Sequence, residues 1–152
     1  MFCVSLDMKV ALKVLFGAVL TAFSVSACSP FGMINSLAHS DNVIVTTGIP
    51  YGSHERQRLD IYRPIWMKDP LPTILFFYGG SWKRGSRENY AFVGHALARQ
   101  GFVVVVSDYR LYPEVQFPTF VHDGAQAIVW ITENIGKYGG LNQNIHLVGH
   151  SA

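Results

Sequence analysis

The hydrophobic pattern divides the chain after residue 42 into short strands and helices. Residues 73–77 and 102–106 are continuous apolar runs, which predict central parallel strands covered by helices on both faces. Residues 43–47 are all β-branched and predict a first strand. Residues 57–62 alternate polar and apolar side chains, which predicts a half-buried strand near a sheet edge.

Helical periodicity separates these strands. Residues 87–99 carry apolar side chains at helical spacing, with Ser86 in position to cap the start and Gly101 just past the end. Residues 121–135 show the same periodicity and predict a second amphipathic helix. Residues 144–148 are short and apolar and predict a buried third strand of the parallel set. Strands joined by such crossovers indicate an α/β fold with a doubly wound sheet.

Composition limits the classes of function. The chain has 152 residues, 49% of them hydrophobic and 14% charged, which is typical of a single globular domain. A net charge of +2 leaves no basic surface of the kind that binds nucleic acid. Nucleic acid is therefore excluded as an expected partner.

The first residues have the pattern of an export signal. Lys9 and Lys13 precede an apolar stretch over residues 14–23, which is too short for a membrane-spanning helix and suits the core of a signal peptide. We therefore predict that residues 1–27 are a signal peptide of the lipoprotein type, removed from the mature protein.

The end of this signal resembles the bacterial lipobox. Residues 25–28 read Val-Ser-Ala-Cys, so lipidation is predicted at Cys28, with membrane attachment through the lipid and no spanning helix. Ser29 follows the cysteine, which in such lipoproteins implies the outer membrane of the bacterial cell envelope. Residues 28–42 are then expected to be a tether, and residues 43–152 the folded domain. The alternative is an ordinary secretory signal that leaves Cys28 as a free thiol.

The last residues carry the candidate chemistry. Gly149-His150-Ser151-Ala152 follows the third strand and matches the start of the Gly-x-Ser-x-Gly nucleophile elbow. In that motif the serine sits on a sharp strand-to-helix turn, so its hydroxyl projects from the sheet. Ser151 is therefore the candidate catalytic nucleophile, and the alternative for a Gly-x-Ser sequence is a simple turn after a strand.

A second glycine turn follows the apolar run at residues 73–77. Gly79 and Gly80 come directly after this strand, where backbone N–H groups lie free to bind a substrate oxygen. The N–H group of Ala152, next to the nucleophile, is the third expected donor. An oxyanion site made of Gly79, Gly80 and Ala152 is the hypothesis, and a plain turn is the alternative.

These motifs together resemble a known family. From about residue 48, the chain is similar to the amino-terminal part of α/β-hydrolases of the hormone-sensitive-lipase-like and carboxylesterase group. That group carries His-Gly-Gly-Gly, then Asp-Tyr-Arg-Leu with Pro-Glu and Phe-Pro, then the elbow. This chain carries the corresponding residues in the same order: Tyr78-Gly79-Gly80-Ser81, Asp108-Tyr109-Arg110-Leu111, Pro113-Glu114, Phe117-Pro118 and Gly149-His150-Ser151-Ala152.

The resemblance implies a serine hydrolase that acts on small-molecule carboxylic esters and needs no cofactor or metal. Two departures are Tyr78 in place of histidine and Ser81 in place of the third glycine. Because Gly-Gly-x-Trp also resembles kynurenine-formamidase-like hydrolases, an amide or formamide substrate remains an alternative. In the family the catalytic acid and histidine lie downstream of the elbow, so Asp108 and Asp123 are expected to be structural.

The expected fold is accordingly an α/β-hydrolase fold truncated after the strand that leads to the nucleophile elbow. The last strand is then expected to be an open apolar edge. We expect the chain as given to be inactive by itself. An alternative of another class is a non-catalytic lipoprotein of the cell envelope, a remnant of a hydrolase.

Overall fold

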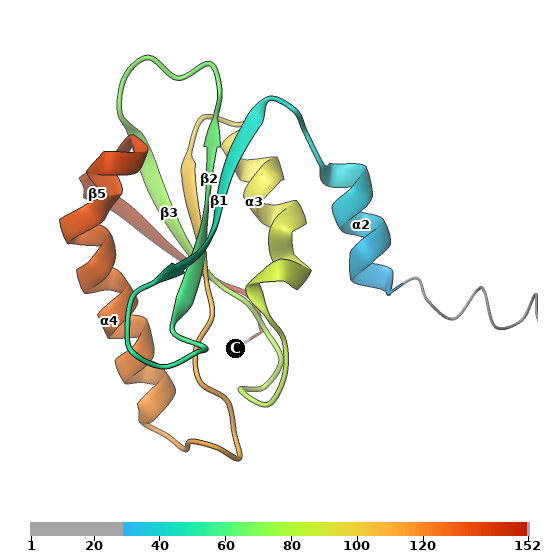
Figure 1. The fold of residues 1–152 in the computed structure, drawn as a ribbon, viewed down its shortest axis with the longest axis vertical. Coiled ribbons are helices and arrows are strands. Elements are labelled where there is room, and N and C mark those ends of the chain that lie inside the picture. The colour runs from blue at the N-terminus through green and yellow to red at the C-terminus, as the bar shows by residue number, and fades with distance from the viewer. Residues whose placement is uncertain (1–28, 152) are drawn as a thin grey trace, which may run out of the picture.

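A computed structural model describes residues 29–151, in which five strands form one sheet (Figure 1). The sheet order is β1-β2-β4-β3-β5. The pairs β1–β2 and β2–β4 are antiparallel, whereas β3 lies parallel to both β4 and β5. This confirms the predicted parallel centre. The strands are β1 (Val43–Pro50), β2 (Arg58–Pro64), β3 (Leu71–Phe77), β4 (Val103–Ser107) and β5 (Gly140–Gly149).

Helices cover both faces of the sheet, α3 on one side and α4 on the other (Figure 1). The helix expected over residues 87–99 begins as a 3₁₀ turn, and Ser86 occupies the N-cap position without a side-chain capping bond. Gly101 has φ 95°, the left-handed conformation that ends a helix. The helical elements are α2 (Pro30–Ala38), η1 (Arg87–Tyr90), α3 (Ala91–Ala98), α4 (Thr119–Asn134) and η2 (Ile135–Tyr138).

Strand alternation divides the core into two clusters. Successive side chains of β4 point to opposite faces, so Val104 and Val106 pack in one cluster while Val103 and Val105 pack in the other. All four are fully buried, as the continuous apolar run predicts. The first cluster also contains Tyr78 and Tyr109, which lie beneath the candidate site.

The prediction for β2 was wrong in one respect. This strand lies next to the edge strand β1, as expected, but it is buried instead of half-buried, and Asp60 is buried together with Leu59 and Ile61. The alternation in sequence is real, but Asp60 is paired instead of solvated: it accepts a hydrogen bond from Gly48 N at 2.7 Å and one from Arg87 Nε at 2.8 Å. A buried carboxylate that has hydrogen-bond partners gives the same alternation of polar and apolar residues in the sequence as an exposed carboxylate does.

Strand β5 is also more exposed than predicted. It forms the edge of the sheet beside β3, and most of its residues are exposed, including Leu147 and Val148. The short apolar run predicted a buried strand. The open apolar edge that was expected for this strand is therefore present among the described residues.

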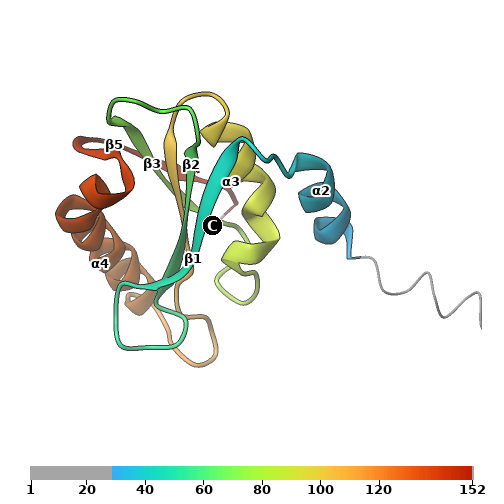
Figure 2. The ribbon, with the colours of Figure 1, turned by 45° about the horizontal axis from the view of Figure 1, so that its top comes forward.

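The predicted tether contains a helix. Helix α2 packs outside α3, on the side away from the sheet (Figure 2). Asn35 holds it there: its Nδ2 donates to Glu88 O at 2.8 Å, and its Oδ1 accepts from Phe92 N at 2.9 Å. Pro30 stands in the first turn, where its missing N–H costs nothing. The predicted signal peptide, Cys28 and Ala152 lie outside the described residues.

Within residues 29–151, none of the helices has the length and apolar character that crossing a bilayer requires.

Candidate active site

The register of β3 and β5 brings the two sequence motifs together. Phe77 pairs with Gly149 in these parallel strands, so both strands end at the same edge of the sheet. His150 N then donates a hydrogen bond to Phe77 O at 3.1 Å, which continues the pairing by one residue. The turns that carry Gly79 and Ser151 therefore start side by side.

Gly79 lies directly against Ser151. A Cβ atom at position 79 would be 2.5 Å from His150 O and 2.9 Å from Ser151 Cβ, so no larger residue fits. Gly80 has φ 146°, and a Cβ there would collide with Arg84 O. Both glycines are thus required by their surroundings.

Ser151 has a strained backbone. Its φ is 51°, in the left-handed region that residues other than glycine seldom adopt. Such strain gathers at functional sites, where the surrounding structure imposes it. A positive φ at a serine just beyond a parallel strand is consistent with the first part of a nucleophile elbow.

A cavity of about 510 Å³ opens beside these turns. Gly79, Gly80 and Ser151 line it together, so three of the predicted site residues share one cavity. The other walls come from α2, the residues after the glycine turn, η1 and the elbow, and of these residues the two sequence motifs contain only Ser81 and His150. The residues of these walls are Phe31, Ser81, Arg84, Gly85, Asn89, Tyr90 and His150.

Phe31 was missed because its segment reads as a tether. The sequence nevertheless contains the pattern of a helix, because a proline stands in the first turn and the apolar residues at positions 31, 34 and 38 have helical spacing. In the structure Phe31 packs against Tyr90, with ring centroids 5.6 Å apart. Helix α2 therefore supplies part of the cavity wall.

Two buried tyrosines support the glycine turn from below. Tyr109 donates its hydroxyl hydrogen to Tyr78 O at 2.6 Å, and the two rings stack with centroids 4.9 Å apart. The carbonyl of Tyr78 and the N–H of Gly79 belong to one planar peptide unit. Holding the carbonyl therefore also holds the direction of the Gly79 N–H group.

Asp108 anchors the same region. It accepts a hydrogen bond from the Tyr78 hydroxyl at 2.6 Å and one from Arg87 N at 2.8 Å, and its second oxygen pairs with the Arg87 guanidinium. Arg56 donates to the Tyr78 hydroxyl at 2.8 Å and to Gly85 O at 3.0 Å. Tyr78 thus takes the place of the histidine usual in the resembling group and is fully buried.

Burial keeps these phenols protonated. It raises the pKa of Tyr109 to about 12. Burial, followed by the charge of Asp108, also raises the pKa of Tyr78. Both hydroxyl groups are therefore hydrogen-bond donors across the neutral range.

Asp123 is occupied by structural contacts, as the sequence analysis expected. It is fully buried and accepts hydrogen bonds from Arg110 N at 2.9 Å and from Gln57 Nε2 at 3.0 Å, in addition to the Arg110 guanidinium. Burial alone would raise the pKa of Asp123, but the hydrogen bonds from Arg110 and Gln57 outweigh it and hold that pKa below its usual value. His150 lines the cavity, with Nδ1 3.4 Å from the Tyr90 hydroxyl.

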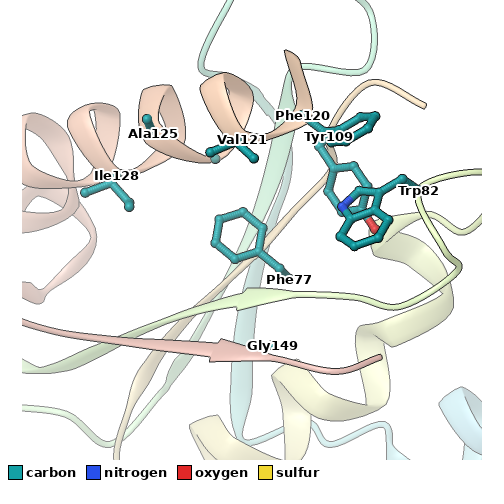
Figure 3. A pocket seen from close by; sticks show the side chains of 9 residues that line it. Phe77, Trp82, Tyr109, Phe120, Val121, Ala125, Ile128 and Gly149 are labelled. Carbon is teal, nitrogen blue, oxygen red and sulfur yellow. The ribbon is translucent and has the colours of Figure 1, made fainter. Parts of the chain in front are cut away.

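A second cavity, of about 390 Å³, lies between α4 and the ends of β3 and β5 (Figure 3). Phe77 and Gly149 contribute to it from the sheet, and Trp82 from the turn after Gly80. Trp82 stacks on Phe120 with ring centroids 5.6 Å apart. The walls are aromatic and aliphatic, so this space suits apolar groups.

Relatives with curated names are esterases. Over 108 residues the chain is 37% identical to a probable isoprenylcysteine alpha-carbonyl methylesterase of Oryza sativa subsp. japonica, covering 71% of this chain and 26% of that protein. Esterase LipC of Mycobacterium tuberculosis is 38% identical over 105 residues, covering 67% and 26% of the respective chains. The chain thus spans about a quarter of the length of the curated relatives it matches.

Solved esterase structures share the fold. A hyperthermophilic esterase from the archaeon Pyrobaculum calidifontis superposes with a TM-score of 0.64 at 31% identity, covering 78% of this chain and 39% of that one. Esterase B of Lactobacillus rhamnosis gives a TM-score of 0.68 over 90% of this chain and 45% of its own, but at 22% identity this likeness concerns the fold alone.

The matches agree with the predicted fold and with the family that the motifs indicated. The sequence model of the BD-FAE family matches residues 59–152, which include both glycine turns and Ser151. The chain belongs to the BD-FAE family of the α/β-hydrolase superfamily.

Proposed function

We propose that this protein is a serine esterase in which Ser151 attacks the carbonyl carbon of a small carboxylic ester. One observation carries the proposal: Ser151, in a left-handed conformation beyond a parallel strand, lies directly against Gly79. The curated esterase relatives support the same reaction class.

In the proposed reaction a bond forms between Ser151 Oγ and the acyl carbon, and the alcohol leaves. The N–H groups of Gly79, Gly80 and Ala152 donate to the oxygen that becomes negative, each worth roughly 3 kcal/mol of barrier. The serine proton passes through a histidine base to the leaving alcohol, and water then releases the acid. In the resembling family this base and its carboxylate partner follow the elbow, so we assign neither to residues 29–151.

The first test uses the protein expressed from its complete gene. We expect Ser151→Ala to abolish hydrolysis of p-nitrophenyl butyrate and labelling by a fluorophosphonate. The matched control is Ser81→Gly, which removes another serine hydroxyl from the same cavity at a φ of 54° that glycine accepts. Retained hydrolysis in Ser151→Ala would contradict the proposal, and loss in both variants would point to damage of the cavity.

A formamide or other amide is the second candidate substrate. The observation that favours it is Trp82, which follows the glycine turn in the Gly-Gly-x-Trp pattern and lines the apolar cavity with Phe120. Comparison of kcat/KM for an aryl formamide and for the matching ester on one preparation separates the two. A protein that neither hydrolyses these substrates nor reacts with the fluorophosphonate is the non-catalytic lipoprotein.

We also propose that Cys28 is lipidated and anchors the protein in the bacterial cell envelope, in the outer membrane. The support is the Val-Ser-Ala-Cys sequence at residues 25–28 after an apolar signal core. The mass of the amino-terminal peptide tests it: a diacylglyceryl increment is expected on Cys28 and must be absent in Cys28→Ser. An unmodified thiol on a peptide that begins at Cys28 contradicts the anchor.

A further inference from the structure

Helix α2 is apolar on two opposite sides. With about 3.6 residues per turn, Phe31, Asn35 and Ala38 share the face that meets η1 and α3. Met33 and Leu37 lie on the opposite side and are 58% and 85% exposed, whereas Ile34 lies at the border of the packed face and is 45% exposed. The helix contains no charged residue.

A helix on the surface of a water-exposed domain ordinarily has polar and charged residues on its outer side. Helix α2 instead presents methionine and leucine there, in the pattern of a helix that is covered on both sides. Figures 1 and 2 place α2 outside α3, with its outer side turned away from the sheet. Among residues 29–151, no element covers this outer side.

The position of Cys28 identifies the cover. Pro30, the first residue of α2, is two residues after Cys28, and two residues span at most about 7 Å even when fully extended. A lipid on Cys28 would therefore hold the first turn of α2 in the headgroup region of the membrane. At that depth an exposed apolar helix face is buried among headgroups and acyl chains.

We propose that α2 lies on the lipid bilayer, with Met33 and Leu37 inserted into its surface. This inference rests on the proposed lipid anchor, and the helix face adds a second membrane contact to it. Because Phe31 in the same helix lines the cavity of Ser151, that cavity opens beside the bilayer. The proposed esterase then receives esters that partition into the membrane.

A fluorescent probe tests the contact without use of activity. Nitrobenzoxadiazole is attached to Leu37→Cys in the full-length lipoprotein, in a background without other reactive thiols, reconstituted on vesicles of phosphatidylethanolamine and phosphatidylglycerol. The matched control is Val129→Cys on α4, which is 56% exposed on the opposite side of the sheet. We expect emission at residue 37 to move to shorter wavelength with a several-fold rise in intensity on the vesicles, with no change at residue 129.

Water-like emission at both positions overturns the proposal. An equal change in emission at both positions overturns it too. So does a shift of the emission at residue 37 in detergent-free buffer without vesicles, because that shift would mean that a second copy or another protein covers α2. The mass of the Cys28 peptide from the same preparation reports separately whether the anchor itself has failed.

A substitution links the contact to substrate delivery. We expect Met33→Glu with Leu37→Glu to lower turnover of a long-chain ester in the vesicles by roughly tenfold, because charged side chains weaken insertion of the helix. Turnover of a soluble short-chain ester should not change, since neither residue lines the cavity. If the double variant turns over the long-chain ester as fast as the parent protein does, delivery through α2 is overturned. If the parent protein hydrolyses neither ester, the esterase proposal is contradicted instead.

Discussion

The hydrogen bond from Tyr109 to Tyr78 O offers a test of how the glycine turn is held. The change is Tyr109→Phe, which removes the hydroxyl and keeps the ring that stacks on Tyr78 at 4.9 Å. The carbonyl of Tyr78 then loses a 2.6 Å donor at a buried position. An acceptor left unsatisfied in this way costs about 1–3 kcal/mol of folding free energy.

The effect on catalysis follows from the shared peptide plane. When the Tyr78 carbonyl is free to rotate, the Gly79 N–H group rotates with it and no longer has a fixed orientation. Deletion of an oxyanion donor costs about 10²–10³ in kcat, and here the donor is misaligned while two others remain. We therefore expect kcat to fall by about ten- to a hundredfold with KM nearly unchanged. The reason is that the hydrogen bond from the Gly79 N–H group to the substrate oxygen is strongest when that oxygen is negatively charged, in the transition state.

The assay measures kcat and KM for p-nitrophenyl butyrate, and urea unfolding of the same preparation measures stability. Tyr51→Phe is the matched control, since it removes a hydroxyl that donates to another buried carbonyl, Asp108 O, at 2.7 Å. Tyr51→Phe should lose less stability, because Asp108 O keeps the hydrogen bond from Ser107 Oγ at 2.9 Å, and only Tyr109→Phe should lose kcat. Equal kcat in the two variants, with Ser151 established as the nucleophile, would refute the role given to Tyr109.

Three further predictions concern stability. Asp123→Asn should lower the free energy of unfolding by about 3 kcal/mol in urea titrations, because it leaves the Arg110 guanidinium without its buried carboxylate partner; an unchanged midpoint would contradict this. Gly94→Ala should cost about 1–3 kcal/mol through overpacking, since its Cβ would collide with the Tyr62 ring; the same measurement checks it, and no loss would mean that the ring moves aside freely. Burial, then the charges of His39 and Arg99, lower the pKa of His95, so its protonation favours the unfolded chain. Stability should accordingly decrease as the pH falls below about 6.5, the ordinary histidine value, and His95→Gln should flatten this slope in thermal melts.

The sequence predicted those parts of the fold whose local pattern has a single structural meaning. The continuous apolar runs that became β3 and β4 could only be buried strands or buried helices, and their length decided between the two. The pairing of the two glycine turns could be inferred because parallel strands end at one edge of a sheet.

The remaining features depend on contacts that are distant in sequence. Asp60 has the pattern of an exposed residue, but Arg87 and Gly48 N satisfy it in the interior. The role of Tyr109 was not visible either, since only the folded chain brings its hydroxyl to Tyr78 O.

The parallel register between β3 and β5 determines where the chain tolerates insertions. Because Phe77 pairs with Gly149, a one-residue slip of β5 would shift Ser151 by about 3.3 Å along the strand and send its side chain toward the opposite face. A single-codon insertion or deletion inside residues 145–149 should thus abolish the site even where the protein still folds. The irregular stretch at residues 141–144, which is exposed and lies where the pairing with β3 shifts register, can take the same insertion without moving Ser151, so length variation among relatives should gather there.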